Sequence, residues 1–126
     1  MDRLFSRDHV WLLSEQNGEF ILGISEFAQQ QLGDIVFVDL PSVADQVTAQ
    51  QSCLVVESVK SASDVISPIS GHISAINEQL IDSPELINES PYQEGWIIRI
   101  NGDSSAVLEG NMSEDEYNKF LETGSN

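Results

Sequence analysis

The chain has 126 residues, of which 21 are Asp or Glu and five are Lys or Arg, so its formal net charge is −16 at pH 7. This length predicts a single domain over 1–126 with its own core, and a hydrophobic content of 40% is too high for a disordered chain. A field this negative repels phosphate backbones and anionic lipid headgroups, which argues against nucleic acid and membranes as partners.

Short runs rich in β-branched and aromatic residues, separated by turn residues, predict a mostly β domain. Their close spacing favours a small barrel or sandwich over alternating strands and helices. The expected strands are 11–13, 20–22, 34–40, 53–56, 65–66, 73–76 and 96–100. Asn17-Gly18 suits the tight turn of a hairpin between the first two of them.

The last expected strand alternates between two faces. Trp96, Ile98 and Ile100 share one side, while Ile97 and Arg99 share the other. We therefore expect Trp96 and Ile98 in the core. On this interpretation Trp96→Ala lowers the free energy of unfolding by about 3–5 kcal/mol.

Two short helical segments are expected before this last strand. Ser25 is placed to cap a helix over 26–32, and Gly33 is placed to end it. Ser83 followed by Pro84 predicts a cap and the first turn of a second, very short helix.

A C-terminal helix is expected over 113–122. Ser113 and Glu116 have the spacing of a capping box, so the acidic residues there stabilise the start of the helix and do not indicate a metal site. Residues 123–126 are expected to be a frayed tail.

Most side chains that could carry chemistry have a structural explanation. Cys53 precedes three apolar residues, which favours a buried structural thiol over a nucleophile, and a lone cysteine excludes an internal disulfide. His9 and His72 have no ligand partners nearby in the sequence, and no glycine is followed by the Lys-Ser or Lys-Thr pair of a phosphate-binding loop. The first eight residues lack the apolar core of a signal peptide. We expect a soluble, cytoplasmic protein with no catalytic residue of its own.

Lys60 differs from the other polar residues. The chain has one other lysine, Lys119, and Lys60 lies among small residues between expected strands 53–56 and 65–66. This arrangement predicts a hairpin with an accessible amine at its tip. A modification site and an ordinary solvated lysine are both compatible with the local sequence.

The sequence around Lys60 resembles the lipoyl-lysine signature of the glycine cleavage H-protein family. The matching residues run Glu57-Ser58-Val59-Lys60-Ser61-Ala62-Ser63-Asp64 and continue as Ser67-Pro68-Ile69-Ser70-Gly71. The segments 23–41 and 83–96 resemble the family's N-terminal and C-terminal blocks, so the resemblance covers residues 9–121.

The resemblance implies a monomeric carrier, not an enzyme, with a barrel-sandwich hybrid fold of two antiparallel sheets. It implies that lipoate is attached to the side-chain nitrogen of Lys60. The carrier would take the aminomethyl group of glycine from glycine decarboxylase (P protein) to the aminomethyltransferase (T protein), and pass electrons to dihydrolipoamide dehydrogenase (L protein).

The resemblance also implies roles for the neighbours of Lys60. Glu57, Ser58 and Val59 belong to the attachment site, and Glu57 is expected to help the lipoylating enzymes to recognise it. Asp64 holds a position that the family uses near the lipoyl arm.

The sequence departs from the family at four positions. Val10 replaces the glutamate of a His-Glu-Trp motif, Gln31 replaces a histidine found in some members, and Ala44 and Gln51 stand at turns where glycine is frequent. If the two turns keep a positive φ, each costs at most about 1 kcal/mol.

Because Val10 removes a carboxylate expected beside the loaded arm, a second function stays open. This alternative is an H-like relay protein that supplies lipoyl groups or redox equivalents to other complexes without glycine cleavage. Asp8 is a candidate to replace the missing carboxylate. A biotin carrier is disfavoured, because Val59 and Ser61 flank Lys60 where methionines usually flank a biotinyl lysine.

Overall fold

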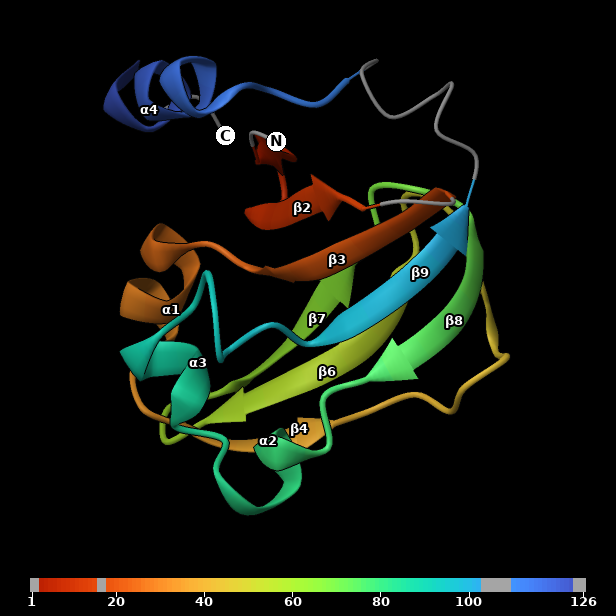
Figure 1. Cartoon of the computed structure of the whole chain (residues 1–126). Coiled ribbons are helices and arrows are strands. Elements are labelled where there is room, and N and C mark those ends of the chain that lie inside the picture. The colour runs from red at the N-terminus through yellow and green to blue at the C-terminus, as the bar shows by residue number, and fades with distance from the viewer. Residues whose placement is uncertain (1–2, 16–17, 103–109, 124–126) are drawn as a thin grey trace.

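We describe the protein from a computed structural model, which describes residues 3–15, 18–102 and 110–123. In this part of the chain two antiparallel sheets face each other, with short helices at one end and a C-terminal helix outside (Figure 1). The six-stranded sheet has the order β1-β2-β3-β9-β8-β5, and the three-stranded sheet has the order β4-β6-β7. This confirms the barrel-sandwich hybrid expected from the sequence.

The elements have the following bounds. The strands are β1 Leu4–Phe5, β2 Val10–Ser14, β3 Glu19–Ile24, β4 Ile35–Asp39, β5 Gln46–Val47, β6 Ser52–Ser58, β7 Ala62–Ile66, β8 Gly71–Ile76 and β9 Ile98–Gly102. The helices are α1 Glu26–Leu32, α2 Gln79–Asp82, α3 Leu86–Glu89 and α4 Glu114–Thr123. The short elements β1, β5 and α2 were not expected from the sequence.

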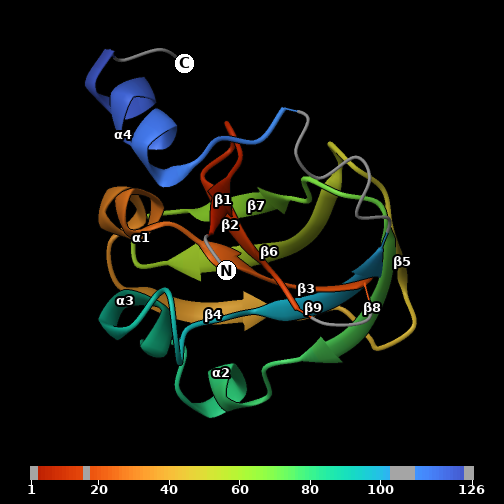
Figure 2. The ribbon, with the colours of Figure 1, turned by 45° about the horizontal axis from the view of Figure 1, so that its top comes forward.

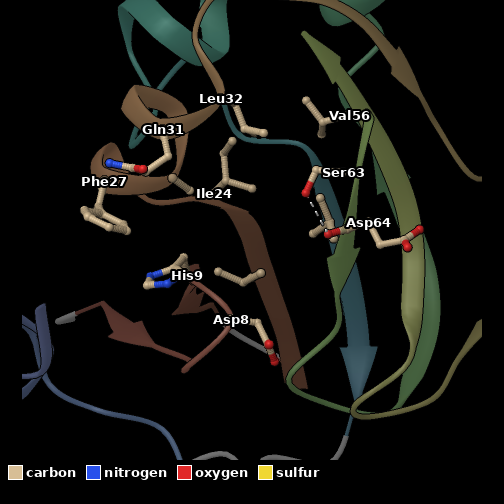
Figure 3. Close-up of a pocket in the computed structure, with 12 residues that line it drawn as sticks. Asp8, His9, Ile24, Phe27, Gln31, Leu32, Val56, Ser63 and Asp64 are labelled. Atoms are coloured by element: carbon tan, nitrogen blue, oxygen red, sulfur yellow. Dashed lines mark hydrogen bonds between the residues drawn. The ribbon is translucent and has the colours of Figure 1, made fainter. Parts of the chain in front are cut away.

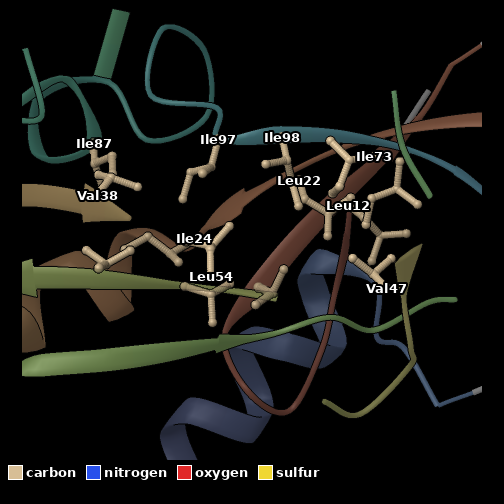
Figure 4. Close-up of a cluster of buried hydrophobic side chains, with 14 of the residues drawn as sticks. Leu12, Leu22, Ile24, Val38, Val47, Leu54, Ile73, Ile87, Ile97 and Ile98 are labelled. Atoms are coloured by element: carbon tan, nitrogen blue, oxygen red, sulfur yellow. The ribbon is translucent and has the colours of Figure 1, made fainter. Parts of the chain in front are cut away.

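The core lies between the two sheets. Leu22, Ile73 and Ile98 of the six-stranded sheet point toward Val38 and Leu54 of the three-stranded sheet (Figure 4). All five side chains are buried. Alternation of apolar and polar residues along each strand therefore sets which face packs inward.

The expected hairpin and the first helix are confirmed. β2 and β3 pair in antiparallel register, although Asn17 of the expected turn lies outside the described residues. The Ser25 hydroxyl accepts a hydrogen bond from the Ala28 amide at 3.1 Å, and Gly33 ends α1 with φ of 83°. Local capping signals thus fix both ends of α1.

The C-terminal helix is confirmed with one residue of difference at each end. Glu116 Oε1 accepts from the Ser113 amide at 2.8 Å, and Ser113 Oγ accepts from the Glu116 amide at 3.2 Å, which completes the capping box. Thr123 belongs to the helix and is not part of a frayed tail, and its hydroxyl donates to the Phe120 carbonyl at 3.1 Å. Residues 124–126 lie outside the described part. Figure 2 shows α4 beside α1 and the β1–β2 turn.

The second helical segment begins later than expected. α3 starts at Leu86 after Glu85, and no side chain caps it, so the prediction of a Ser83 cap is wrong. Ser83 contributes its carbonyl instead, which accepts from the Leu86 amide at 3.1 Å. The Ser-Pro pair therefore forms the preceding turn.

The placement of Trp96 in the main core is also wrong, whereas that of Ile98 is confirmed. Trp96 is half-buried, in a second cluster on the outer face of the six-stranded sheet, while Ile97 is buried. β9 begins only at Ile98, because the Asn77 side-chain amide donates to the Trp96 carbonyl at 2.7 Å. The period of two therefore does not extend back to Trp96.

The two turn positions discussed for glycine behave differently. Ala44 has φ of 80°, as expected if the family's glycine conformation is kept. The neighbouring turn places its positive φ of 71° at Gln50, so Gln51 does not keep the glycine conformation and the conditional cost does not apply there.

Candidate functional site

Lys60 lies at the tip of the hairpin that joins β6 to β7. Ser58 organises this tip: its amide donates to the Ser61 carbonyl at 2.8 Å, and its hydroxyl accepts from the Lys60 and Ser61 amides, each at 3.2 Å. The Val59 amide donates to the Asp34 carbonyl at 3.0 Å. These bonds hold the backbone of the exposed Lys60 in a fixed place.

The Lys60 side chain lies along the end of α1. A Cβ atom added at Gly33 would come within 3.1 Å of Lys60 Cε and 3.7 Å of Nζ. Gly33 is thus favoured by its φ of 83°, and a side chain there would also displace the flexible end of Lys60 by a few tenths of an ångström. Among the described residues, no carboxylate lies within 4 Å of the Lys60 ammonium.

A cavity of about 300 Å³ lies beside the hairpin, between α1, β7 and the turn before β2 (Figure 3). Its walls are mostly apolar and include Val10, Ile24 and Leu32. Polar groups line the rest: Asp8, His9, Gln31, Ser63 and the backbone of Asp64. Two of the family departures, Val10 and Gln31, therefore lie in the same cavity.

His9 is a cavity residue that the sequence did not single out for function. Its Nδ1 lies 2.7 Å from the Tyr117 hydroxyl, which lies 2.7 Å from Ser25 Oγ. Its ring centroid is 4.9 Å from that of Phe27. Burial lowers the pKa of His9, and the negative charge of Asp8 opposes this shift. Contacts from α4 and α1 position this ring. The signal in the sequence that could have found it is the resemblance of His9-Val10-Trp11 to the family's His-Glu-Trp motif.

The remaining residues expected at the site, Glu57, Val59 and Asp64, do not point toward one another. Glu57 is exposed and pairs with Phe37 across the sheet, and Val59 is exposed beside Lys60. Asp64 contributes backbone to the cavity, but Figure 3 shows its side chain turned away, and its Oδ1 accepts from Ser52 Oγ at 3.0 Å. The structure brings Lys60 and Ser58 together and separates the Asp64 carboxylate from the cavity.

Cys53 has the surroundings of a structural residue. Its Sγ donates to the Val65 carbonyl at 3.4 Å, and it packs against the core. Burial raises the pKa of this thiol to about 11, so the nucleophilic thiolate is scarce near neutral pH.

Two absences hold for the described residues alone. No group of three or more His, Cys, Asp or Glu side chains is arranged to hold a metal ion there. No helix in this part of the chain has the length and apolar character needed to cross a membrane.

The chain is a two-sheet β domain with an exposed lysine at a hairpin tip next to a cavity, an arrangement that suits a carrier domain. The family model described as Glycine cleavage H-protein matches residues 3–124. The chain belongs to this family.

Individual relatives agree with the family assignment. The glycine cleavage system H proteins of Salmonella arizonae and Escherichia coli are each 48% identical over 118 residues, which cover 94% of this chain and 92% of each relative. The crystal structure of a glycine cleavage system H protein from Mycobacterium marinum is similar with a TM-score of 0.85 at 34% identity. That match covers 98% of this chain and 97% of the other. These findings support the carrier role in glycine cleavage and do not favour the relay alternative.

Proposed function

We propose that Lys60 carries lipoate on its side-chain nitrogen, and that the loaded chain takes the aminomethyl group of glycine from P protein to T protein and passes electrons to L protein. The observation that carries this proposal is the Lys60 amine, held on a rigid exposed turn against Gly33 and next to a cavity. When bound, the lipoyl group supplies a disulfide that accepts two electrons and exchanges with thiols.

The residues present fit such a group. Gly33 leaves room for the lysine stem, and the apolar cavity walls formed by Val10, Ile24 and Leu32 suit a hydrocarbon chain. His9 and Ser63 add hydrogen-bonding groups to these walls. Excluding water from the end of the arm would limit loss of the aminomethyl group as formaldehyde and ammonia.

Asp8 is the carboxylate best placed to provide negative charge to the cavity in place of the family glutamate that Val10 replaces. It lies at the cavity rim two residues before Val10, its side chain is exposed, and its charge acts on His9. An amine in the cavity would be attracted by this charge. Glu57 lies on the outer face, where we propose that it contributes to recognition by lipoylating enzymes.

Intact-mass measurement after co-expression with a lipoylation pathway tests the attachment. We expect one lipoyl group on the wild-type chain and on Lys119→Ala, and none on Lys60→Ala or Lys60→Arg. An unmodified wild-type chain would overturn the proposal. Bicarbonate exchange with P protein tests the carrier step, and a lipoylated chain that fails to support exchange would restore the relay alternative.

A further inference from the structure

Three exposed apolar side chains lie at and beside the tip of the Lys60 hairpin, and the cavity does not account for them. The exposed fractions are 53% for Val36, 51% for Phe37 and 66% for Val59. We name these residues the β4 patch. Large apolar side chains that gather on a surface commonly mark a site of protein association.

The strand geometry explains why Val36 and Phe37 are both exposed. The pairing of β4 with β6 is irregular between Ile35 and Phe37, so one additional residue is inserted there. Ile35 and Val38 on either side are both buried. A regular strand would have turned one of the two patch residues inward, whereas the bulge keeps both at the surface.

The β4 patch is continuous with the modification site. Phe37 pairs with Glu57, and Ile35 pairs with Ser58, which begins the Lys60 turn. The hydrogen bond from the Val59 amide to the Asp34 carbonyl joins that turn to the start of β4. β6 lies between β4 and β7, so the patch and the cavity lie on opposite sides of the central strand.

Negative charge surrounds the patch. Asp34, Asp39 and Glu57 are exposed around it, and Lys60 is the only basic residue between positions 34 and 64. The complementary surface is therefore apolar at its centre and carries Lys or Arg at its rim.

We infer that the β4 patch is the docking surface for the enzyme that attaches the lipoyl group to Lys60, which rests on the proposed function. Enzymes that use the loaded arm act on the disulfide at its far end, several bonds away from Nζ. The attaching enzyme must bring its acyl donor to Nζ itself, so its surface must cover the residues next to Lys60. The patch is the apolar surface within that short reach.

The attachment reaction needs an activated acyl donor, and a lipoyl adenylate supplies one. The neutral Lys60 nitrogen attacks the acyl carbon, the C–N bond forms, the bond to the phosphate oxygen breaks, and AMP and a proton are released. No oxidant or reductant is needed. The patch contributes binding energy to this step and no chemistry.

The test measures the rate of Lys60 modification by a lipoate–protein ligase supplied with ATP and lipoate, read by intact mass at several carrier concentrations. Phe37→Ser and Val59→Ser are compared with Val43→Ser and Ile81→Ser, which alter apolar residues with exposed fractions of 56% and 66% that are not part of the β4 patch. We expect each patch variant to raise the ligase KM about tenfold and each control to change it less than twofold. Circular dichroism melts and sedimentation accompany each variant.

The outcomes separate this inference from the proposed function. A wild-type chain that is not modified sinks the proposed function. Wild-type rates in both patch variants, or equal slowing in the controls, overturn the docking surface alone. If the wild type is a dimer that Phe37→Ser converts to a monomer, the patch binds a second copy of the chain, and the docking inference is overturned. A raised KM for P protein with no change in the rate of modification would overturn the inference as well. If Phe37→Ser melts early, Val59→Ser on the exposed turn decides.

Discussion

At the scale of single residues, Ala44 holds a backbone conformation that suits glycine. Its φ is 80°, its side chain is exposed, and its amide donates to the Ile73 carbonyl at 2.8 Å, which keeps the turn in place. The left-handed conformation costs a residue with a Cβ about 1–2 kcal/mol. Glycine avoids this steric cost, but folding removes more backbone freedom from glycine than from alanine, so only part of the cost is recovered. We expect Ala44→Gly to raise the free energy of unfolding by about 0.5–1 kcal/mol in urea.

Gln51→Gly provides the matched control for this prediction. Gln51 lies in the next turn, without a positive φ, so glycine there adds only freedom to the unfolded chain and should be neutral or destabilising. If Ala44→Gly proves less stable than the wild type, the turn does not hold the conformation described here.

Asp8 and Asp64 differ in which way their carboxylates face. Asp8 stands at the cavity rim, whereas the Asp64 carboxylate bonds to Ser52. We expect Asp8→Asn to speed the loss of formaldehyde and ammonia from the loaded carrier severalfold, because an amine in the cavity loses its counter-charge. Asp64→Asn should leave this rate unchanged, and a reversed order of the two variants would refute the assignment of Asp8. The amount of lipoyl attached, read by mass, controls for loading.

At the scale of elements, the segment that leads into β9 places Trp96 and Ile97 in different surroundings, so their truncation should lower the free energy of unfolding by different amounts. Ile97 is buried in the main core, while Trp96 is half-buried with the Arg99 guanidinium 5.6 Å from its ring centroid. Ile97→Ala should cost about 2–5 kcal/mol, because it leaves a cavity between well-packed side chains. Trp96→Ala should cost less than Ile97→Ala, since its surroundings can be filled by water. Equal or reversed losses in urea unfolding would contradict the start of β9 at Ile98.

The elements that the sequence predicts well are those with local signals. Ser25 and Gly33 bound α1, Ser113 and Glu116 cap α4, and small residues around Lys60 mark its hairpin. Each signal acts between residues no more than four apart, so it does not depend on contacts with distant parts of the chain.

What the sequence misses depends on contacts between distant segments. The start of β9 is set by Asn77, whose amide bonds to the Trp96 carbonyl, and the His9 ring is placed by Tyr117 from α4. The cavity needs α1, β7 and the turn before β2 together. Periodicity within one segment carries no information about such pairings.

At the scale of the whole molecule, the net charge of −16 acts on folding and on docking in opposite ways. In the described part of the chain, the ion pairs join Arg99 to Glu15 and Glu19, at 3.5 and 3.8 Å, and the acidic face of α4 stays exposed. Like charges repel within the folded chain, so added salt should stabilise it. We expect the same charges to attract partner enzymes to the carrier, so added salt should weaken that attraction.

Because salt should stabilise the fold and weaken docking, a loss of docking at higher salt cannot be explained by unfolding of the carrier. Raising salt from about 0.05 to 0.3 M shortens the screening length, so we expect the apparent KM for the loaded carrier with P protein to rise severalfold while kcat changes little. Over the same range the melting temperature of the carrier should rise, because screening relieves its self-repulsion. Free lipoamide with L protein is the control, since a neutral small substrate gains nothing from steering. A flat KM would mean that the negative surface plays no part in docking, even if the melting temperature rises as expected.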